Sequence, residues 1–136
     1  MIQVFCNKRG SGKTKKLIEL ANTELAGAKG DSVNIDNDLK YIRQIDRRIR
    51  FVATKEFEIE DYEGFYGLLC GIISENYDIE NIYIDGVFTI ETSSIKESAY
   101  WFKKIYKLSS KFKINVYMNV DYEKKEIPDF IREYVA

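Results

Sequence analysis

Residues 5–14 of the chain read Phe-Cys-Asn-Lys-Arg-Gly-Ser-Gly-Lys-Thr. A short apolar run at residues 2–6 predicts a buried strand that leads into this stretch. An amphipathic run at residues 13–26 predicts a helix that begins at its end. Closely spaced glycines between a strand and a helix let backbone N–H groups and the helix N-terminus approach an anion. We therefore predict that this turn binds phosphate.

The rest of the sequence alternates short apolar runs with longer amphipathic ones. The predicted strands are residues 2–6, 32–36, 50–54, 81–85 and 113–118. The predicted helices are residues 13–26, 38–48, 62–76 and 94–109, followed by a short last helix whose first turn contains Pro128. Ser94 and Glu97 form a capping-box pattern at the start of the fourth helix. This alternation predicts an α/β fold, a three-layer αβα sandwich with a mostly parallel five-stranded sheet, in a single domain spanning 1–136.

Composition narrows the function classes. The net charge is −1, so the protein as a whole has no electrostatic attraction to nucleic acid or to an anionic membrane. The chain has no histidine, which excludes the commonest general base. Cys6 and Cys70 do not have the spacing of metal ligands, and we interpret them as reduced thiols. Because no signal peptide or membrane-spanning run is recognisable, we expect a cytoplasmic protein.

The phosphate-binding turn matches the pattern G-x-x-x-x-G-K-[ST] except at its first position, Asn7. Asparagine tolerates a left-handed backbone better than most residues do, so the turn can still form. In this pattern Lys13 reaches the outer phosphates and the Thr14 hydroxyl binds Mg²⁺. The candidate nucleotide-binding residues are Asn7, Lys8, Arg9, Gly10, Ser11, Gly12, Lys13, Thr14 and Lys16.

With this turn, the chain resembles the P-loop NTPase superfamily, and within it the RecA-like branch, including the core of the thymidine kinase family. The resemblance implies that Asp85, at the end of the strand Asn-Ile-Tyr-Ile-Asp, is the Walker B acid that holds the Mg²⁺ shell through water. It also implies that strand 113–118 lies between strands 2–6 and 81–85. Asn119 matches the place of a γ-phosphate sensor, with Asp121 as a second candidate; turn chemistry is the alternative for Asn119. The implied catalytic residues are Lys13, Asp85 and Asn119, and the implied metal ligands are Thr14 and Asp85.

The chain departs from this branch in several ways. The glutamate that commonly follows the Walker B aspartate as a base is replaced by Gly86. The zinc-binding insert and the longer C-terminal lobe of thymidine kinases are missing. No Asp-x-x-Gly begins at Asp85, and no Asn-Lys-x-Asp is present, which favours ATP over GTP.

Two charge clusters have open interpretations. Lys40, Arg43, Arg47 and Arg50 would line one face of the predicted second helix, either as a strip for nucleic acid or phosphate or as a solvated face. The acidic run between Glu56 and Glu63 is either an exposed loop or edge strand, or a loop over the nucleotide that supplies the missing base.

The sequence thus predicts a protein that binds ATP with Mg²⁺ and hydrolyses it slowly or only with a partner. The alternatives are a small-molecule kinase of the nucleoside type, whose acceptor pocket would use the acidic run and the helix at 62–76, and a non-hydrolysing switch or assembly subunit. A DNA-associated ATPase of the phage kind is a further alternative. A protein partner or a homo-oligomer fits each of them, and no membrane is expected.

Overall fold

The computed structural model describes residues 1–7, 12–90, 95–122 and 127–135 of the chain. Its strands are β1 (Ile2–Asn7), β2 (Asp31–Asp36), β3 (Arg50–Ala53), β4 (Ile79–Ile90) and β5 (Asn115–Tyr122). Its α-helices are α1 (Lys13–Leu25), α2 (Tyr62–Glu75), α3 (Ile95–Phe112) and α4 (Asp129–Arg132). Short 3₁₀ turns span Ile42–Gln44 and Thr54–Phe57. The order of elements confirms the predicted alternation, and the predicted helix at 38–48 is the one exception.

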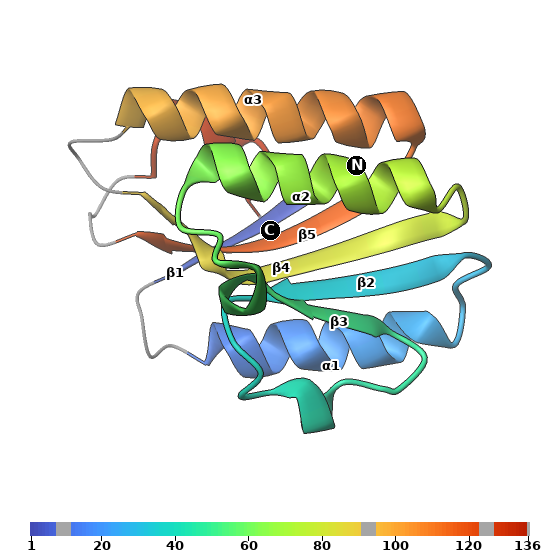
Figure 1. Ribbon diagram of the computed structural model, residues 1–136. Coiled ribbons are helices and arrows are strands. Elements are labelled where there is room, and N and C mark those ends of the chain that lie inside the picture. The colour runs from blue at the N-terminus through green and yellow to red at the C-terminus, as the bar shows by residue number, and fades with distance from the viewer. Residues whose placement is uncertain (8–11, 91–94, 123–126, 136) are drawn as a thin grey trace.

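The strands form one five-stranded sheet in the order β1-β5-β4-β2-β3, and every neighbouring pair is parallel. The chain is therefore an α/β protein, and its sheet is entirely rather than mostly parallel. β5 lies between β1 and β4, as the resemblance implied. Because all strands run in the same direction, their carboxyl ends lie along one edge of the sheet, next to the start of α1 (Figure 1).

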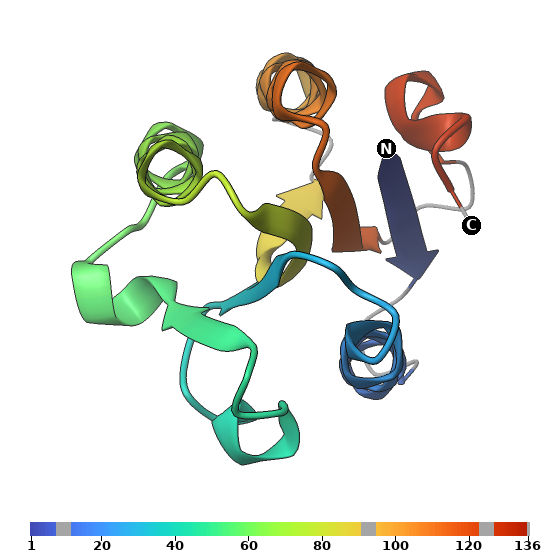
Figure 2. The same cartoon turned by 90° about the vertical axis from the view of Figure 1, so that its right-hand side faces the viewer.

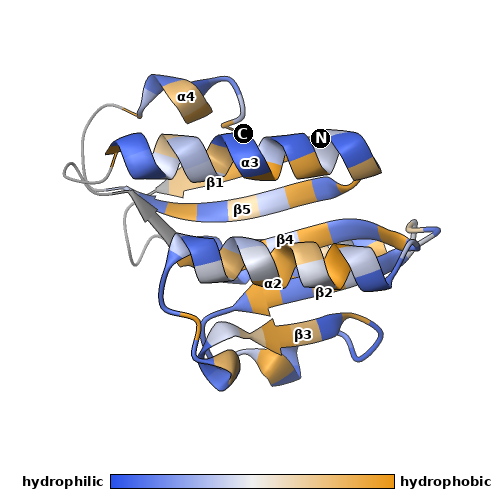
Figure 3. Cartoon of the chain, turned by 45° about the horizontal axis from the view of Figure 1, so that its top comes forward, coloured by the Kyte–Doolittle hydropathy of each residue, from blue (hydrophilic) through white to orange (hydrophobic). Residues whose placement is uncertain are grey.

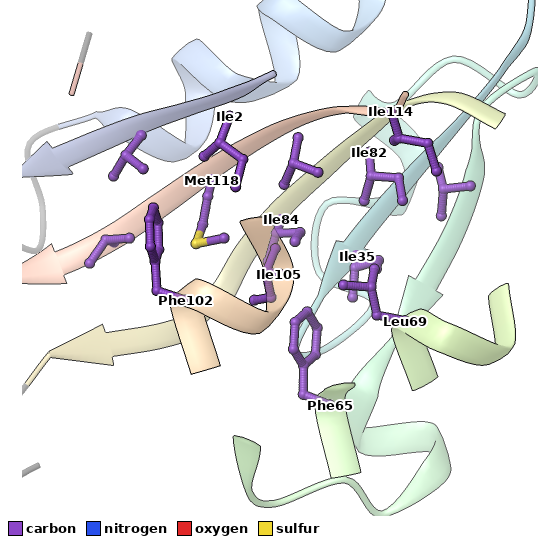
Figure 4. Packing of buried hydrophobic residues seen from close by; sticks show 14 of the residues in the cluster. Ile2, Ile35, Phe65, Leu69, Ile82, Ile84, Phe102, Ile105, Ile114 and Met118 are labelled. Carbon is purple, nitrogen blue, oxygen red and sulfur yellow. The ribbon is translucent and has the colours of Figure 1, made fainter. Parts of the chain in front are cut away.

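Helices cover both faces of the sheet. α2, α3 and α4 lie on one face, and α1 and the 3₁₀ turn Ile42–Gln44 lie on the other (Figure 2). Successive side chains of a strand point to opposite faces. Ile82 and Ile84 thus join the larger core beneath α2 and α3 (Figure 4). Tyr83 joins the smaller core against α1, where its ring stacks on Tyr117 with centroids 5.0 Å apart.

Apolar and polar residues alternate along α2 and α3 with helical periodicity (Figure 3). The apolar face of α2 buries Phe65, Leu69 and Ile73 against the sheet. α2 begins at an N-cap, Asp61, whose Oδ1 accepts a hydrogen bond from the Gly64 N–H at 2.7 Å. Ser94, the predicted capping residue of α3, lies outside the described residues. None of the helices in the described ranges is long and apolar enough to span a bilayer.

The C-terminal segment completes the outer edge of the sheet. The backbone N–H of Val4 donates to the Tyr134 carbonyl at 2.7 Å, and Val135 forms an isolated parallel bridge with Val4. Ile131 of α4 is fully buried in the larger core. Pro128 immediately precedes α4, as the N-cap residue, so the predicted short last helix is confirmed.

The predicted helix at 38–48 is wrong. This segment contains only the 3₁₀ turn Ile42–Gln44, and Leu39 is 43% exposed. Aspartate side chains compete with the helix here: Asp38 Oδ1 accepts from the Lys40 N–H at 3.0 Å, and Asp46 Oδ1 accepts from the Arg48 N–H at 2.9 Å. The predicted basic strip is therefore not a helix face.

We expect Leu69→Ala to lower the free energy of unfolding by about 2–5 kcal/mol, because it opens a cavity in the core beneath α2. Leu39→Ala removes the same side-chain atoms from an exposed loop position. It should change the free energy of unfolding by less than about 0.5 kcal/mol. Urea denaturation followed by circular dichroism measures both. A cost for Leu39→Ala comparable to that for Leu69→Ala would contradict the loop placement.

Candidate functional site

The N-terminus of α1 lies at the carboxyl edge of the sheet. Gly12 precedes the helix with φ +82°, a left-handed conformation that favours glycine. No side chain caps the helix start within the described residues, and no acidic residue occurs in its first turn. The N–H groups of this turn lack intrahelical partners and have positive partial charge. This end of α1 is therefore suited to an anion. The predicted residues Lys8, Arg9, Gly10 and Ser11 lie outside the described residues.

Three polar side chains form a row across the strand ends opposite this helix. The parallel register pairs Ile84 with Met118 and with Ile35, so Asn119, Asp85 and Asp36, the residues that follow, stand side by side on β5, β4 and β2. By strand alternation all three point to the α1 face of the sheet. We refer to Asn119, Asp85 and Asp36 as the polar row.

A cleft of about 710 Å³ lies between α1 and the strand ends. It contains Lys13 and Thr14 from the helix and Asp36 and Asp85 from the polar row. The full lining is Gly12, Lys13, Thr14, Lys15, Asp36, Asn37, Asp38, Lys40, Tyr41, Gln44, Asp85, Gly86 and Asp121. Lys16, which sequence reasoning also placed at the nucleotide, is exposed and does not line the cleft.

Lys13 is buried, with only 8% of its surface exposed. Its ammonium group forms an ion pair with the Asp121 carboxylate at the end of β5. A buried ammonium group is stable only with such a counter-charge. The Lys13 ammonium group is therefore held at the surface of the cleft, where an anion in the cleft would contact it.

Asn119 is 2% exposed and does not line the cleft. Its side-chain amide donates to the Lys13 carbonyl at 3.1 Å, which ties β5 to the first residue of α1. Its Oδ1 atom has no hydrogen-bond partner in the described part of the structure. Asn119 thus holds the helix start in place, and it carries a buried oxygen that is still available.

Asp85 lies at a β-bulge. The register between β4 and β5 passes from Ile84↔Met118 to Phe88↔Val120, so β4 has extra residues at this point. Gly86 makes the bulge with φ +68°, and its N–H donates to Asp85 Oδ1 at 2.8 Å. β4 begins at Ile79 and pairs with β5 again from Phe88, so it is longer than the predicted strand 81–85. The Asp85 side chain lines the cleft at this bulge, and 8% of the residue surface is exposed.

Sequence reasoning did not select Asp36 for the site. Asp36 is 6% exposed, and its Oδ1 accepts from the Asn37 N–H at 2.6 Å. Burial raises the pKa of Asp36 to about 7; the Asn37 hydrogen bond opposes this shift, and the charges of Asp85 and Asp38 add to it. One sequence signal could have found it: the strands Ser-Val-Asn-Ile-Asp and Asn-Ile-Tyr-Ile-Asp both end in Ile-Asp.

A second pocket of about 430 Å³ adjoins the cleft. Both cavities are lined by Asn37 and Gly86. The second pocket also contains Glu60, Asp61 and Tyr62, which belong to the acidic run and the start of α2. The acids of the run are all exposed, and Glu60 and Asp61 are the ones that line this pocket.

No protein-family model matches this sequence, and the search of curated proteins also finds no match.

Gly86→Ala should destabilise the protein by about 1–2 kcal/mol or more, because a β-carbon at this positive φ would lie 2.6 Å from Asp36 Oδ1. Gly71→Ala is the matched control, since nothing lies within 4 Å of its β-carbon in α2. That change should stabilise the protein by about 0.5–1 kcal/mol. Thermal or urea unfolding measures the change in stability of each variant. If Gly86→Ala left the stability unchanged, the close approach of Gly86 to Asp36 would be refuted.

Proposed function

We propose that this chain binds ATP with Mg²⁺ in the cleft and hydrolyses it slowly or only with a partner. The observation that carries the proposal is the position of the first turn of α1. This turn, with Lys13 and Thr14, faces Asp85 across a cleft of about 710 Å³. The helix end and the lysine would attract the phosphate chain, and the carboxylate and the hydroxyl would hold the cation.

The phosphates would bind to groups that already carry positive charge. The first-turn N–H groups would donate to phosphate oxygens, and the Lys13 ammonium would exchange Asp121 for the outer phosphates. Because Asn119 fixes the Lys13 carbonyl, the helix start is held in place before any ligand arrives. Such preorganisation reduces the entropic cost of binding.

The oxygen donors available fit Mg²⁺. Thr14 supplies a hydroxyl and Asp85 a carboxylate, both in the cleft lining. Within the described ranges, no group of three or more His, Cys, Asp or Glu side chains is arranged to hold a metal ion. Mg²⁺ commonly binds through one or two carboxylates together with substrate phosphates and water. When bound, the cation would neutralise charge on the phosphates, and its retention would depend on the nucleotide.

Slow turnover follows from the residue after Asp85. The resemblance places a base there, whereas Gly86 has no side chain and forms the bulge of β4. Hydrolysis at this site would then depend on another group of the chain or on a partner.

Lys13→Ala should weaken ATP binding by at least about a hundredfold, which corresponds to a charged contact of about 3 kcal/mol. Fluorescence titration with a labelled ATP measures the affinity, and circular dichroism confirms the fold. Lys29→Ala is the control, because Lys29 is exposed beyond the end of α1 and outside the cleft lining. If Lys13→Ala and Lys29→Ala bound ATP with equal affinity, the cleft would not be the ATP-binding site.

The second pocket favours one other function, a small-molecule kinase. A hydroxyl-bearing acceptor there would meet the nucleotide cleft at Asn37 and Gly86, which line both cavities. Acids such as Glu60 could accept hydrogen bonds from its hydroxyl groups.

Chromatography after incubation with Mg·ATP and a nucleoside mixture separates the two functions. We expect ADP and free phosphate in equal amounts, formed slowly. ADP with a phosphorylated acceptor would instead identify a kinase, and Glu60→Gln should then reduce transfer without changing ATP affinity. ATP that stays bound without any ADP would restrict the function to nucleotide binding.

A further inference from the structure

We infer that Asp36 is a second carboxylate ligand for the divalent cation of the cleft, acting beside Asp85. This inference rests on the proposed Mg·ATP function, since it concerns the cation of the same site. It extends the site from the β4 strand end, where the resemblance places a single acid, to the neighbouring strand β2.

The position of Asp36 relative to Asp85 is fixed by the sheet. β2 and β4 pair in parallel with Ile35 opposite Ile84, so the two aspartates follow at the same level and on the same face. Gly86 lies so close to Asp36 that an added β-carbon would be 2.6 Å from Oδ1. Both carboxylates line the cleft that Thr14 faces from α1. The three side chains therefore converge from two layers of the fold.

Among the described residues, no basic side chain pairs with either carboxylate. Asp36 and Asp85 are both buried. Lys13 also lines the cleft, but its ammonium group forms an ion pair with Asp121 instead. Two buried carboxylates side by side are costly unless a cation or a shared proton offsets their charge.

Asn119, the third member of the polar row, lies next to the carboxylate pair but outside the cleft lining. Asn119 stands on the other side of Asp85, and its Oδ1 is a buried acceptor without a partner among the described residues. Buried polar atoms in folded proteins normally have a partner, which can be water. A cation held by Asp85 and Asp36 with bound water would supply such a donor. Carboxylate, amide and hydroxyl oxygens are the ligands preferred by Mg²⁺ and Mn²⁺.

Mn²⁺ serves as the probe because its free form is measured directly by electron paramagnetic resonance. Each protein is titrated with Mn²⁺ alone and with Mn²⁺ plus a non-hydrolysable ATP analogue. The affinity for the labelled nucleotide is measured separately in EDTA. The variants are Asp36→Asn and Asp38→Asn. Asp38 lines the same cleft, and its Oδ1 accepts from the Lys40 N–H. The two variants make the same chemical change, carboxyl to amide, in the same cavity, so they separate ligation by Asp36 from general effects on the cavity.

We expect Asp36→Asn to weaken Mn²⁺ binding by about tenfold or more, the usual effect of removing a group that supports a metal site. Asp38→Asn should weaken it by less than about threefold. Nucleotide affinity in EDTA should not fall in Asp36→Asn, because the change removes a carboxylate from the cleft that takes the phosphates. Equal Mn²⁺ affinities for the two variants, or no loss in Asp36→Asn, would overturn the inference and leave the pair as a proton-sharing contact.

The proposed function can fail separately. If wild-type protein binds Mn²⁺ in an Asp36-dependent way but binds no nucleotide, the cation site stands and the ATP proposal falls. If nucleotide binds in EDTA while Mn²⁺ does not bind at all, the cation site falls. Should Asp36→Asn not fold, Mn²⁺ is added to wild-type protein labelled for NMR. Broadening of the Asn37 and Gly86 amides before other signals then supports the inference, and its absence rejects it.

Discussion

Parallel strand direction is the constraint on which the candidate site depends. Because all five strands run the same way, their carboxyl ends meet at one edge, and α1 must begin beside that edge when the chain leaves β1. The positive end of a helix is thereby set against the strand ends, where polar side chains can stand without disturbing the core. The hydrogen bond from Asn119 to the Lys13 carbonyl ties β5 to the start of α1. The cleft is the space that this arrangement leaves open.

Charge in the cleft is arranged in two groups. The helix end and Lys13 favour an anion, whereas Asp36 and Asp85 favour a cation. A phosphate chain that carries a divalent cation would offer an anion to the first group and a cation to the second. A phosphate or a cation alone would match only one of them. Asp121 pairs with Lys13 within the chain, so the buried ammonium group has a counter-charge. Gly86 has no side chain, and this leaves room for Asp36 beside Asp85.

Local patterns were sufficient to predict most elements, including the strand before residues 8–11 and the helix after them. They failed at 38–48, where apolar spacing suggested a helix but the side chains of Asp38 and Asp46 bind the backbone in turns. They also missed Asp36, because its proximity to Asp85 depends on which strand lies beside β4. That neighbour is set by long-range packing, which no local spacing records. Asp85 could be selected from the sequence because it ends the apolar strand Asn-Ile-Tyr-Ile-Asp.

Amide NMR spectra of the wild-type protein, recorded while ATP and Mg²⁺ are added, test the central claim most directly. The account predicts that the largest shifts occur at Gly12, Lys13 and Thr14, with smaller ones at Asn37 and Gly86 across the cleft. Signals from the far end of the sheet, such as Asp31 and Ile79, should hardly move. Shifts centred away from the start of α1, or no shifts at millimolar ATP, would contradict it.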